Sequence, residues 1–300
     1  MMKTKKVTKA VIPAAGFGTR FLPQTKAMPK EMLPIVDKPI IQYVVEDLVA
    51  VGIKDIIIVT GYHKRSIEDH FDTPSKELVE NLKKGGVKKK PLLDEIKQIS
   101  ELANFIYVRQ KGPYGNGTPL LNVRSLVGNE PFIYTWSDDF IDAKPNEFAQ
   151  LITVNKEFGC SVLGSVRAQS EADYDRYGFA GGEEIRPGLI RAETIIEKPG
   201  KANAPSDLAT VSSFLFTPDI FKYLDQVMAN LKPKQELFYN DMLSLMLKDG
   251  KKIIAAEIKG GKYYDTGNKL EYLKTITEFA LRHPGLGAKY KEYLKSLKMD

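Results

Sequence analysis

The chain has 300 residues, and its 44 lysines and arginines exceed its 38 aspartates and glutamates, which leaves a formal net charge of +6. Hydrophobic residues make up 43% of the chain and charged residues 27%, a balance that supports a packed core and excludes a disordered or fibrous chain. The single cysteine, Cys160, excludes an internal disulfide, a cysteine-based zinc site and a paired-thiol redox centre. The three histidines are too scattered to form a HExxH-type metal site.

The first half of the chain alternates between strand and helix patterns. Residues 8–14 and 55–60 are short apolar runs typical of buried parallel strands, and between them apolar residues recur at helical spacing over 40–49. Further strands are expected at 105–109, 131–136 and 161–166, and helices at 92–102, 118–127 and 146–157. Such alternation predicts an α/β fold with a mainly parallel, doubly wound sheet that has helices on both faces.

The second half changes from this alternation to a run of strands and then to helices. Strands are expected at 177–180, 189–197 and 208–216, and helices at 218–229, 235–248 and 268–282. We interpret the strands as an insertion that binds substrate. Because no stretch has a linker composition, we expect a single domain over residues 1–300, with a core over about 7–267 and C-terminal helices over about 268–300. The lysine-rich stretch 83–91 is expected to be a mobile loop.

Charge and hydropathy also bear on location and partners. No apolar run approaches the roughly 20 residues of a membrane helix, so no membrane partner is expected. Pro13 and Gly16 interrupt the apolar run near the basic N-terminus, which argues against a signal peptide and predicts a cytoplasmic location. The lysines at 83–84 and 88–90 have no aromatic residues between them, which favours a solvated surface over a nucleic-acid groove. A positive net charge suits an anionic small substrate equally well.

The segment after the first strand has the composition of a phosphate-binding loop. Small residues, among them Gly16 and Gly18, let backbone N–H groups approach an anion. The pattern is not the dinucleotide fingerprint, because Phe21 stands where that motif has its third glycine. Arg20 and Lys30 are close enough in sequence to help neutralise a triphosphate. The nucleotide-binding residues expected here are Ala14, Ala15, Gly16, Gly18, Thr19 and Lys26.

Several motifs resemble those of a known family. Gly-x-Gly-Thr-Arg at 16–20, followed by Pro-x-Thr-Lys-x-x-Pro-Lys-Glu-Met-Leu-Pro at 23–34, resembles the start of bacterial UTP–glucose-1-phosphate uridylyltransferases, which are sugar-nucleotide pyrophosphorylases. The likeness extends from about residue 9 to residue 290, with motifs at 36–43, 70–72, 92–95, 109–110, 197–199, 264–270 and 282–284.

The resemblance implies a Rossmann-like nucleotide-diphospho-sugar transferase fold, Mg²⁺ as cofactor, and a homodimer or homotetramer. The reaction that it implies joins UTP and glucose 1-phosphate and gives UDP-glucose and pyrophosphate. In that reaction the sugar phosphate attacks the α-phosphorus of UTP in line. Its demands are positioning and charge neutralisation, because the nucleophile is already an anion.

Two groups of candidate site residues follow the ends of predicted strands. Asp138 ends the strand at 131–136, and Asp265 ends a later strand; the resemblance implies that both bind Mg²⁺, with Asp139 as a neighbour. Gln110 and Gly115 follow the strand at 105–109, where an amide and bare backbone suit the hydrogen-bonding edge of a uracil ring.

A third group is expected to bind the sugar phosphate. Glu197 offers a carboxylate to sugar hydroxyls, and Lys198 offers a cation to the phosphate. Gly178 has no side chain and leaves room for a sugar ring, a role that the resemblance also implies. The catalytic residues that the resemblance implies are Arg20, Lys30 and Lys198, which would offset the charge of two anionic substrates.

The chain departs from the usual family pattern at Thr118, Pro119, Ser137, Ser212 and Thr266, and over the segment 236–241. Ser212 stands where a glycine of the sugar pocket is expected and adds a hydroxyl beside the sugar. We expect these departures to affect substrate identity more than reaction type. Three alternatives stay open: a pyrophosphorylase for another pair, with dTTP or a different hexose 1-phosphate as a substrate, a non-catalytic regulator that binds nucleotide sugars, and a nucleic-acid-binding module.

Overall fold

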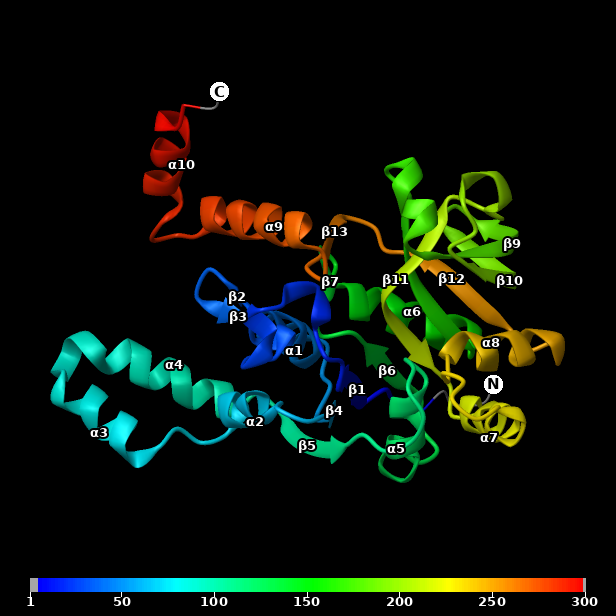
Figure 1. Cartoon of the computed structure of the whole chain (residues 1–300), viewed down its shortest axis with the longest axis horizontal. Helices are drawn as coiled ribbons and strands as arrows, with labels where there is room; N and C mark the ends of the chain where they lie inside the picture. Colours follow the sequence, from blue (N-terminus) through cyan, green and yellow to red (C-terminus); the bar gives the residue numbers. More distant parts are fainter. Residues whose placement is uncertain (1–4, 299–300) are drawn as a thin grey trace.

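The computed structural model describes residues 5–298, and a long mixed sheet runs through them (Figure 1). The strands are β1 (Lys9–Ala14), β2 (Pro34–Ile35), β3 (Lys38–Pro39), β4 (Asp55–Thr60), β5 (Asn104–Arg109), β6 (Phe132–Thr135), β7 (Asp139–Ala143), β8 (Ser161–Arg167), β9 (Gly178–Arg186), β10 (Leu189–Glu197), β11 (Leu208–Phe216), β12 (Ile253–Glu257) and β13 (Gly261–Asp265). The helices are α1 (Ile40–Ala50), α2 (Arg65–Phe71), α3 (Lys76–Lys84), α4 (Lys90–Ser100), α5 (Thr118–Val127), α6 (Glu147–Phe158), α7 (Ile220–Asn230), α8 (Tyr239–Lys248), α9 (Lys269–Arg282) and α10 (Gly287–Ser296).

The main sheet has nine strands in the order β5-β4-β1-β6-β11-β8-β12-β10-β9. Strands β5, β4, β1 and β6 are parallel, as the strand-helix alternation predicts. Beyond β6 the sheet is mixed, because β11 runs antiparallel to both of its neighbours while β8 and β12 are parallel to each other. A separate pair, β13 with β7, is antiparallel and brings two distant parts of the chain together.

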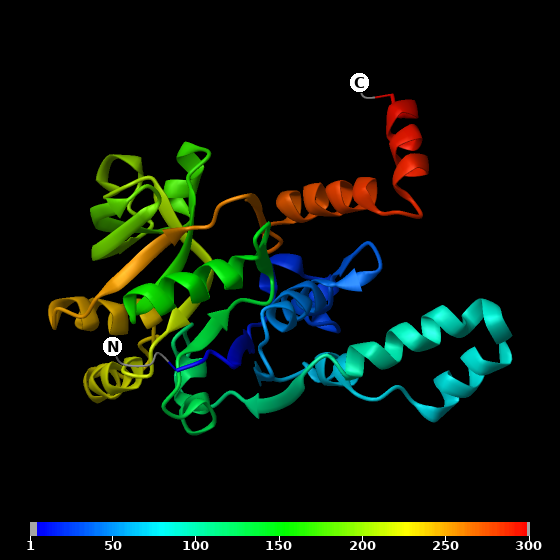
Figure 2. The same cartoon turned by 180° about the vertical axis from the view of Figure 1, so that it is seen from behind.

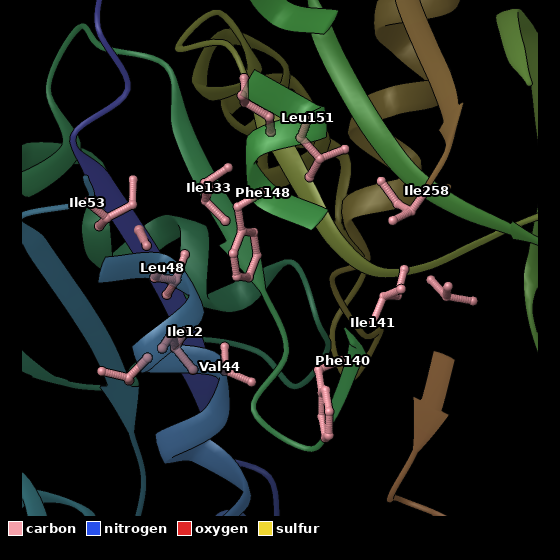
Figure 3. Close-up of a cluster of buried hydrophobic side chains, with 14 of the residues drawn as sticks. Ile12, Val44, Leu48, Ile53, Ile133, Phe140, Ile141, Phe148, Leu151 and Ile258 are labelled. Carbon is pink, nitrogen blue, oxygen red and sulfur yellow. The ribbon is translucent and has the colours of Figure 1, made fainter. Parts of the chain in front are cut away.

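Side chains alternate along each strand, so both faces of the sheet present apolar residues, and helices cover both faces. In β1, Ile12 packs on the face covered by α1 and α6, whereas Val11 packs on the face covered by α5, α7 and α8. Figure 3 shows the first of these clusters, in which Ile12 lies near Val44 of α1 and Ile133 of β6. The doubly wound arrangement that the periodicity predicts is therefore present.

Two helical arms extend from the body of the molecule, as the two opposite views show (Figure 1, Figure 2). One consists of α3 and α4, and the other of α9 and α10. The first arm corrects an expectation, because the lysine-rich stretch 83–91 is not a loop: it contains the end of α3, a short 3₁₀ turn (Gly86–Lys89) and the start of α4. The side chain of Ser75 caps α3, and the lysines that follow favour helix.

The other expected elements occur near their predicted positions, with two shifted boundaries. The strand expected over 177–180 is longer, because β9 extends to Arg186. The helix expected over 235–248 begins at Tyr239, and the residues before it form an extended segment beside the candidate site. The sequence patterns did not predict α2, α3, β2, β3, β7 or β12. Within the part of the chain that the structure describes, no helix combines the length and the apolar character needed to cross a membrane.

Candidate active site

The carboxyl ends of the four parallel strands meet at one edge of the sheet. Register places Ala14 of β1 beside Thr60 of β4, and Thr60 beside Arg109 of β5. The loops that follow β1, β4, β5 and β6 therefore start close together, which is where ligands bind in open α/β sheets.

Three adjoining cavities open at this edge, and Lys30 and Asp138 line all three. The small lobe, of about 200 Å³, is lined also by Arg20. The Gln110 lobe has about 400 Å³, and the Glu197 lobe about 480 Å³. The cavities thus form one branched crevice with a common centre.

The centre of the crevice is a close ion pair between Lys30 and Asp138, with Nζ and Oδ2 2.5 Å apart. Burial opposes the charge on Lys30, but the carboxylates of Asp138 and Glu31 outweigh it and raise the lysine pKa. Glu31 is itself fully buried and accepts a hydrogen bond from Lys64, at the start of α2, over 2.7 Å. A buried carboxylate therefore ties the segment that carries Lys30 to the next element.

The glycine-rich loop packs closely against Lys30. Gly18 has a left-handed backbone with φ of 66°, and a Cβ there would approach Lys30 Cβ to 3.2 Å. Its carbonyl accepts a hydrogen bond from the Thr25 hydroxyl over 2.7 Å, which closes the turn. Only glycine combines this conformation with this contact.

Some of the nucleotide-binding residues predicted in this loop line the crevice, and others do not. Ala15 and Gly16 line the Gln110 lobe, whereas Gly18, Thr19 and Arg20 line the small lobe. Ala14 is buried in β1 and Lys26 is exposed, and within residues 5–298 neither is among those that line the three lobes.

Carboxylates from two distant segments converge beside Lys30. A Cβ on Gly267 would lie 3.2 Å from both Asp138 Oδ2 and Asp265 Oδ1, and 3.1 Å from Arg20 Nη1. Burial and the charge of Asp138 raise the pKa of Asp265, while Arg20 opposes the shift. The structure thus brings together three of the residues that the sequence predicted for metal and phosphate binding.

Asp139 belongs to the same cluster. It faces Asp265 in the β7–β13 register, and its Oδ2 accepts a hydrogen bond from the Tyr263 hydroxyl over 2.9 Å. Its Oδ1 is buried and has no hydrogen-bond partner among residues 5–298. Burial, with Asp138 and Asp265 nearby, holds the pKa of Asp139 well above its usual range. An incompletely satisfied cluster of carboxylate oxygens has the donor chemistry that a hard divalent cation prefers.

The Gln110 lobe combines a polar amide with exposed aromatic rings. Gln110 and Gly115 both line it, as predicted, and the Gln110 backbone N–H donates to Thr60 O over 2.8 Å. The rings of Phe17 and Tyr114 are each 68% exposed and lie 6.3 Å apart, tilted by 53°. Flat apolar faces beside a hydrogen-bonding amide suit a planar heterocycle.

The Glu197 lobe contains the three predicted sugar-binding residues. Gly178 pairs with Glu197 across β9 and β10, and a Cβ on Gly178 would come within 3.1 Å of Glu197 Oε2. Lys198 follows with φ of 48°, and its N–H donates to Tyr177 O over 3.0 Å. Arg176 and Tyr239 also line this lobe, and no sequence pattern indicated a role for either residue.

Most departures from the family pattern are accommodated by hydrogen bonds inside the protein. The Thr118 hydroxyl donates to Pro113 O over 2.7 Å, the Ser137 hydroxyl to Pro13 O over 3.1 Å, and the Thr266 hydroxyl to Asp138 O over 2.5 Å. Pro119 stands in the first turn of α5, where proline fits.

Ser212 differs from what the sequence suggested. It lines the Glu197 lobe, but its hydroxyl donates to the buried Glu147 carboxylate over 3.1 Å and is not free to contact a sugar. Its φ of 61° is left-handed, which explains why a glycine fits this position equally well.

A doubly wound sheet with a crevice at the carboxyl ends of its parallel strands is typical of nucleotide-binding α/β proteins. The sequence matches the nucleotidyl transferase family over residues 9–281, and the chain belongs to that family. The α/β nucleotidyl transferase fold predicted from the sequence is thereby confirmed.

Curated relatives are similar to the chain over nearly its whole length. A UTP–glucose-1-phosphate uridylyltransferase of Staphylococcus epidermidis is 42% identical over 293 residues, which cover 98% of this chain and 99% of the relative. UTP–glucose-1-phosphate uridylyltransferase 2 of Staphylococcus saprophyticus is 43% identical over 296 residues, which cover 99% of this chain and 100% of the relative. The resemblance found in the sequence motifs is confirmed.

Solved structures of UDP-glucose pyrophosphorylases are also similar to this chain. A UDP-glucose pyrophosphorylase complexed with UDP-glucose superposes with a TM-score of 0.80 at 36% identity, covering 93% of this chain and 100% of that chain. The UTP-bound UGPase of Acinetobacter baumannii superposes with a TM-score of 0.87 at 34% identity, covering 98% of this chain and 100% of that chain.

Proposed function

We propose that this protein transfers a uridylyl group from UTP to glucose 1-phosphate and releases UDP-glucose and pyrophosphate. The names of its full-length relatives support this reaction. The observation that carries it in the structure is the branched crevice, in which three lobes meet at the Lys30–Asp138 pair. Two substrates that must exchange a group need two compartments that open on one reacting centre.

The reaction forms a bond between a phosphate oxygen of glucose 1-phosphate and the α-phosphorus of UTP, and it breaks the bond from that phosphorus to pyrophosphate. The nucleophile is already an anion, so no general base is required. The protein therefore has to hold two mutually repelling anions in line and neutralise the charge of the transition state.

Each lobe takes one part of the substrates in this proposal. Gln110 and Gly115 bind the uracil edge, and the glycine-rich loop with Arg20 binds the triphosphate. Lys30, at the common centre, offsets charge around the α-phosphorus. The Glu197 carboxylate accepts hydrogen bonds from sugar hydroxyls.

In this proposal Lys198 binds the phosphate of glucose 1-phosphate. Lys198 lies directly after Glu197, so the two side chains divide the sugar and its phosphate between them. Arg176 lines the same lobe and adds positive charge beside Lys198. Both cations reduce the repulsion between this substrate and the triphosphate.

The acidic cluster fits a divalent cation, and we propose Mg²⁺. Asp138 and Asp265 would hold it, because their oxygens converge next to Arg20, and because burial and the neighbouring Asp138 carboxylate disfavour the charged form of Asp265 in the absence of a cation. When bound, Mg²⁺ supplies Lewis-acid neutralisation of the phosphate oxygens.

We also propose a homodimer or homotetramer. The arm formed by α9 and α10 exposes leucines, among them Leu270 and Leu273, which are 59% and 60% exposed on adjacent turns of one helix face. Burial of such a face against another copy would stabilise an assembly.

The experiment that tests the reaction is pyrophosphate release with Mg²⁺ over a matrix of nucleoside triphosphates and sugar phosphates. We expect UTP with glucose 1-phosphate to have the highest kcat/KM. A higher kcat/KM for dTTP would assign the protein to the thymidylyl alternative. Binding without turnover for every pair would support the non-catalytic alternative.

A further inference from the structure

One short segment, residues 237–240, contacts both the Gln110 lobe and the Glu197 lobe. It contains Leu237 and Phe238, before α8, and Tyr239 and Asn240, which begin that helix. We call it the bridging segment. The sequence pattern predicts a helix over these residues, and the segment 236–241 departs from the usual family pattern without indicating a role.

At one end the bridging segment holds the loop that carries Gly115. The Leu237 N–H donates to Tyr114 O over 2.7 Å, and the Gly117 N–H donates to Leu237 O over 2.8 Å. A Cβ on Gly115 would lie only 2.1 Å from Leu237 O. Because Leu237 is completely buried, the loop and the segment are packed as one unit.

A second contact strengthens this end. The side chain of Asn116 accepts a hydrogen bond from the Tyr239 N–H over 3.1 Å, and Asn116 lines both lobes. The Tyr239 ring lies 5.9 Å from the ring of Trp136, which also lines both lobes. The two lobes are therefore separated by residues that the bridging segment holds.

At the other end the bridging segment contacts the predicted sugar-binding carboxylate. The Asn240 amide donates to Glu197 Oε2 over 3.2 Å. The same oxygen lies over Gly178, where a Cβ would come within 3.1 Å of it. The Glu197 side chain is otherwise exposed, so the amide on one side and the glycine on the other define its orientation.

The two ends cannot move independently. Asn240 stands in the first turn of α8, and Met242, Leu243 and Met246 of this helix are buried in the core. A displacement of the Gly115 loop acts on Leu237 and Tyr239, and through the helix start on Asn240.

We propose that Asn240 is a positioning residue for Glu197, and that the bridging segment makes the sugar-phosphate site respond to the base held in the Gln110 lobe. The inference rests on the proposed function. A correctly bound base seats the Gly115 loop, and the helix start then holds the Asn240 amide against Glu197. Loss of a hydrogen bond to a carboxylate weakens sugar-phosphate binding without removing any charged group.

The test of positioning uses three variants at one position, with KM and kcat measured for each substrate at saturating concentrations of the other. Asn240→Ala is expected to raise the KM for glucose 1-phosphate about tenfold and leave the KM for UTP within about twofold. Asn240→Thr, which restores a donor, should recover part of the loss. Asn240→Asp, which keeps the size and removes the donor, should be at least as impaired as the alanine variant.

The matched control is Asn230→Ala, which removes an amide that donates to Gln226 O in α7 on the surface. It should keep wild-type constants. Thermal unfolding of all variants should coincide, since Asn240 is only half-buried. A sugar-phosphate KM within twofold of wild type in Asn240→Ala, or wild-type behaviour of Asn240→Asp, overturns the proposal.

The test of whether the base held in the Gln110 lobe affects the sugar-phosphate site compares UTP with dTTP as the nucleotide substrate. In the wild-type chain the KM for glucose 1-phosphate should be several times higher with dTTP, and in Asn240→Ala the two KM values should become equal. A ratio that Asn240→Ala leaves unchanged overturns the proposal, and so does equality in the wild-type chain. If the wild-type chain makes no UDP-glucose, the proposed function fails as well. An active wild-type chain with unaffected variants overturns this inference alone.

Discussion

Lys198 has a left-handed backbone at the point where β10 leaves the sheet, a conformation that a lysine adopts only where its surroundings impose it. The hydrogen bond from its N–H to Tyr177 O is one such constraint. This backbone conformation determines the direction in which the Lys198 side chain leaves the chain. At the scale of single residues, the site thus depends on backbone geometry as much as on side-chain chemistry.

We predict that Lys198→Ala raises the KM for glucose 1-phosphate and lowers kcat/KM about 100-fold, because a charge-assisted contact to phosphate is lost. Steady-state pyrophosphate release measures both constants. Lys201→Ala is the matched control, because Lys201 is exposed and pairs with Glu171 outside the crevice. Unchanged sugar-phosphate kinetics in the Lys198 variant would remove this residue from the site.

Asp138 is the second residue whose replacement is informative, because it pairs with Lys30 and converges with Asp265. We predict that Asp138→Asn abolishes Mg²⁺-dependent turnover while circular dichroism and thermal unfolding show an intact fold. Asp142→Asn, at an exposed pair with Arg282, should stay active and serves as control. Near wild-type activity of the Asp138 variant would place the metal elsewhere.

At the scale of elements, Glu147 joins three of them. It begins α6, accepts a hydrogen bond from the Ile141 N–H of β7, and accepts two from Ser212 and Ser213 of β11. Burial raises its pKa to about 7, while the hydrogen bonds from Ser213, Ile141 and Ser212 oppose the shift. The carboxyl is protonated in the folded protein at a pH at which the unfolded chain has already released the proton.

This difference predicts how stability changes with pH. Between the ordinary pKa of 4.5 and the folded value of about 7, the folded state binds more protons, so stability falls as pH rises. Relative to Glu147→Gln, the wild-type free energy of unfolding should decrease by about 1.4 kcal/mol per pH unit at most, and by about 3 kcal/mol in total. Urea unfolding of both proteins from pH 5 to pH 8 measures the difference. A flat difference over this range would contradict the assignment.

At the scale of the whole molecule, α9 packs against the body through Tyr272 and Phe279, but it also exposes Leu270 and Leu273, and α10 continues beyond it (Figure 1). We predict a dimer or tetramer in analytical ultracentrifugation, and a shift toward monomer when Leu270 and Leu273 are both replaced by glutamate. Leu78→Glu, on the other arm, is the control and should leave the mass unchanged. A wild-type chain that sediments as a monomer at tens of micromolar would falsify this assembly.

Sequence patterns predicted the local parts of this molecule. The alternation of strands and helices up to β8, the glycine-rich turn at Gly16 and Gly18, and the separate segments that contain Gln110 and Glu197 all follow from spacing between near neighbours. The prediction was wrong where it relied on composition. The lysine run at 83–91 has the charge of a loop, but it forms part of a capped helical hairpin.

Only the tertiary structure decided which of these segments meet. The β7–β13 pairing brings Asp265 beside Asp138, β11 enters the sheet antiparallel between β6 and β8, and Leu237 packs against Gly115. The physical reason is that a strand's own residues determine its two faces, whereas its neighbours, direction and register depend on burial over the whole sheet. The sequence by itself therefore predicted most of the elements and, with the family resemblance, most of the residues that line the crevice, and the packing of distant segments decided how those residues contact one another.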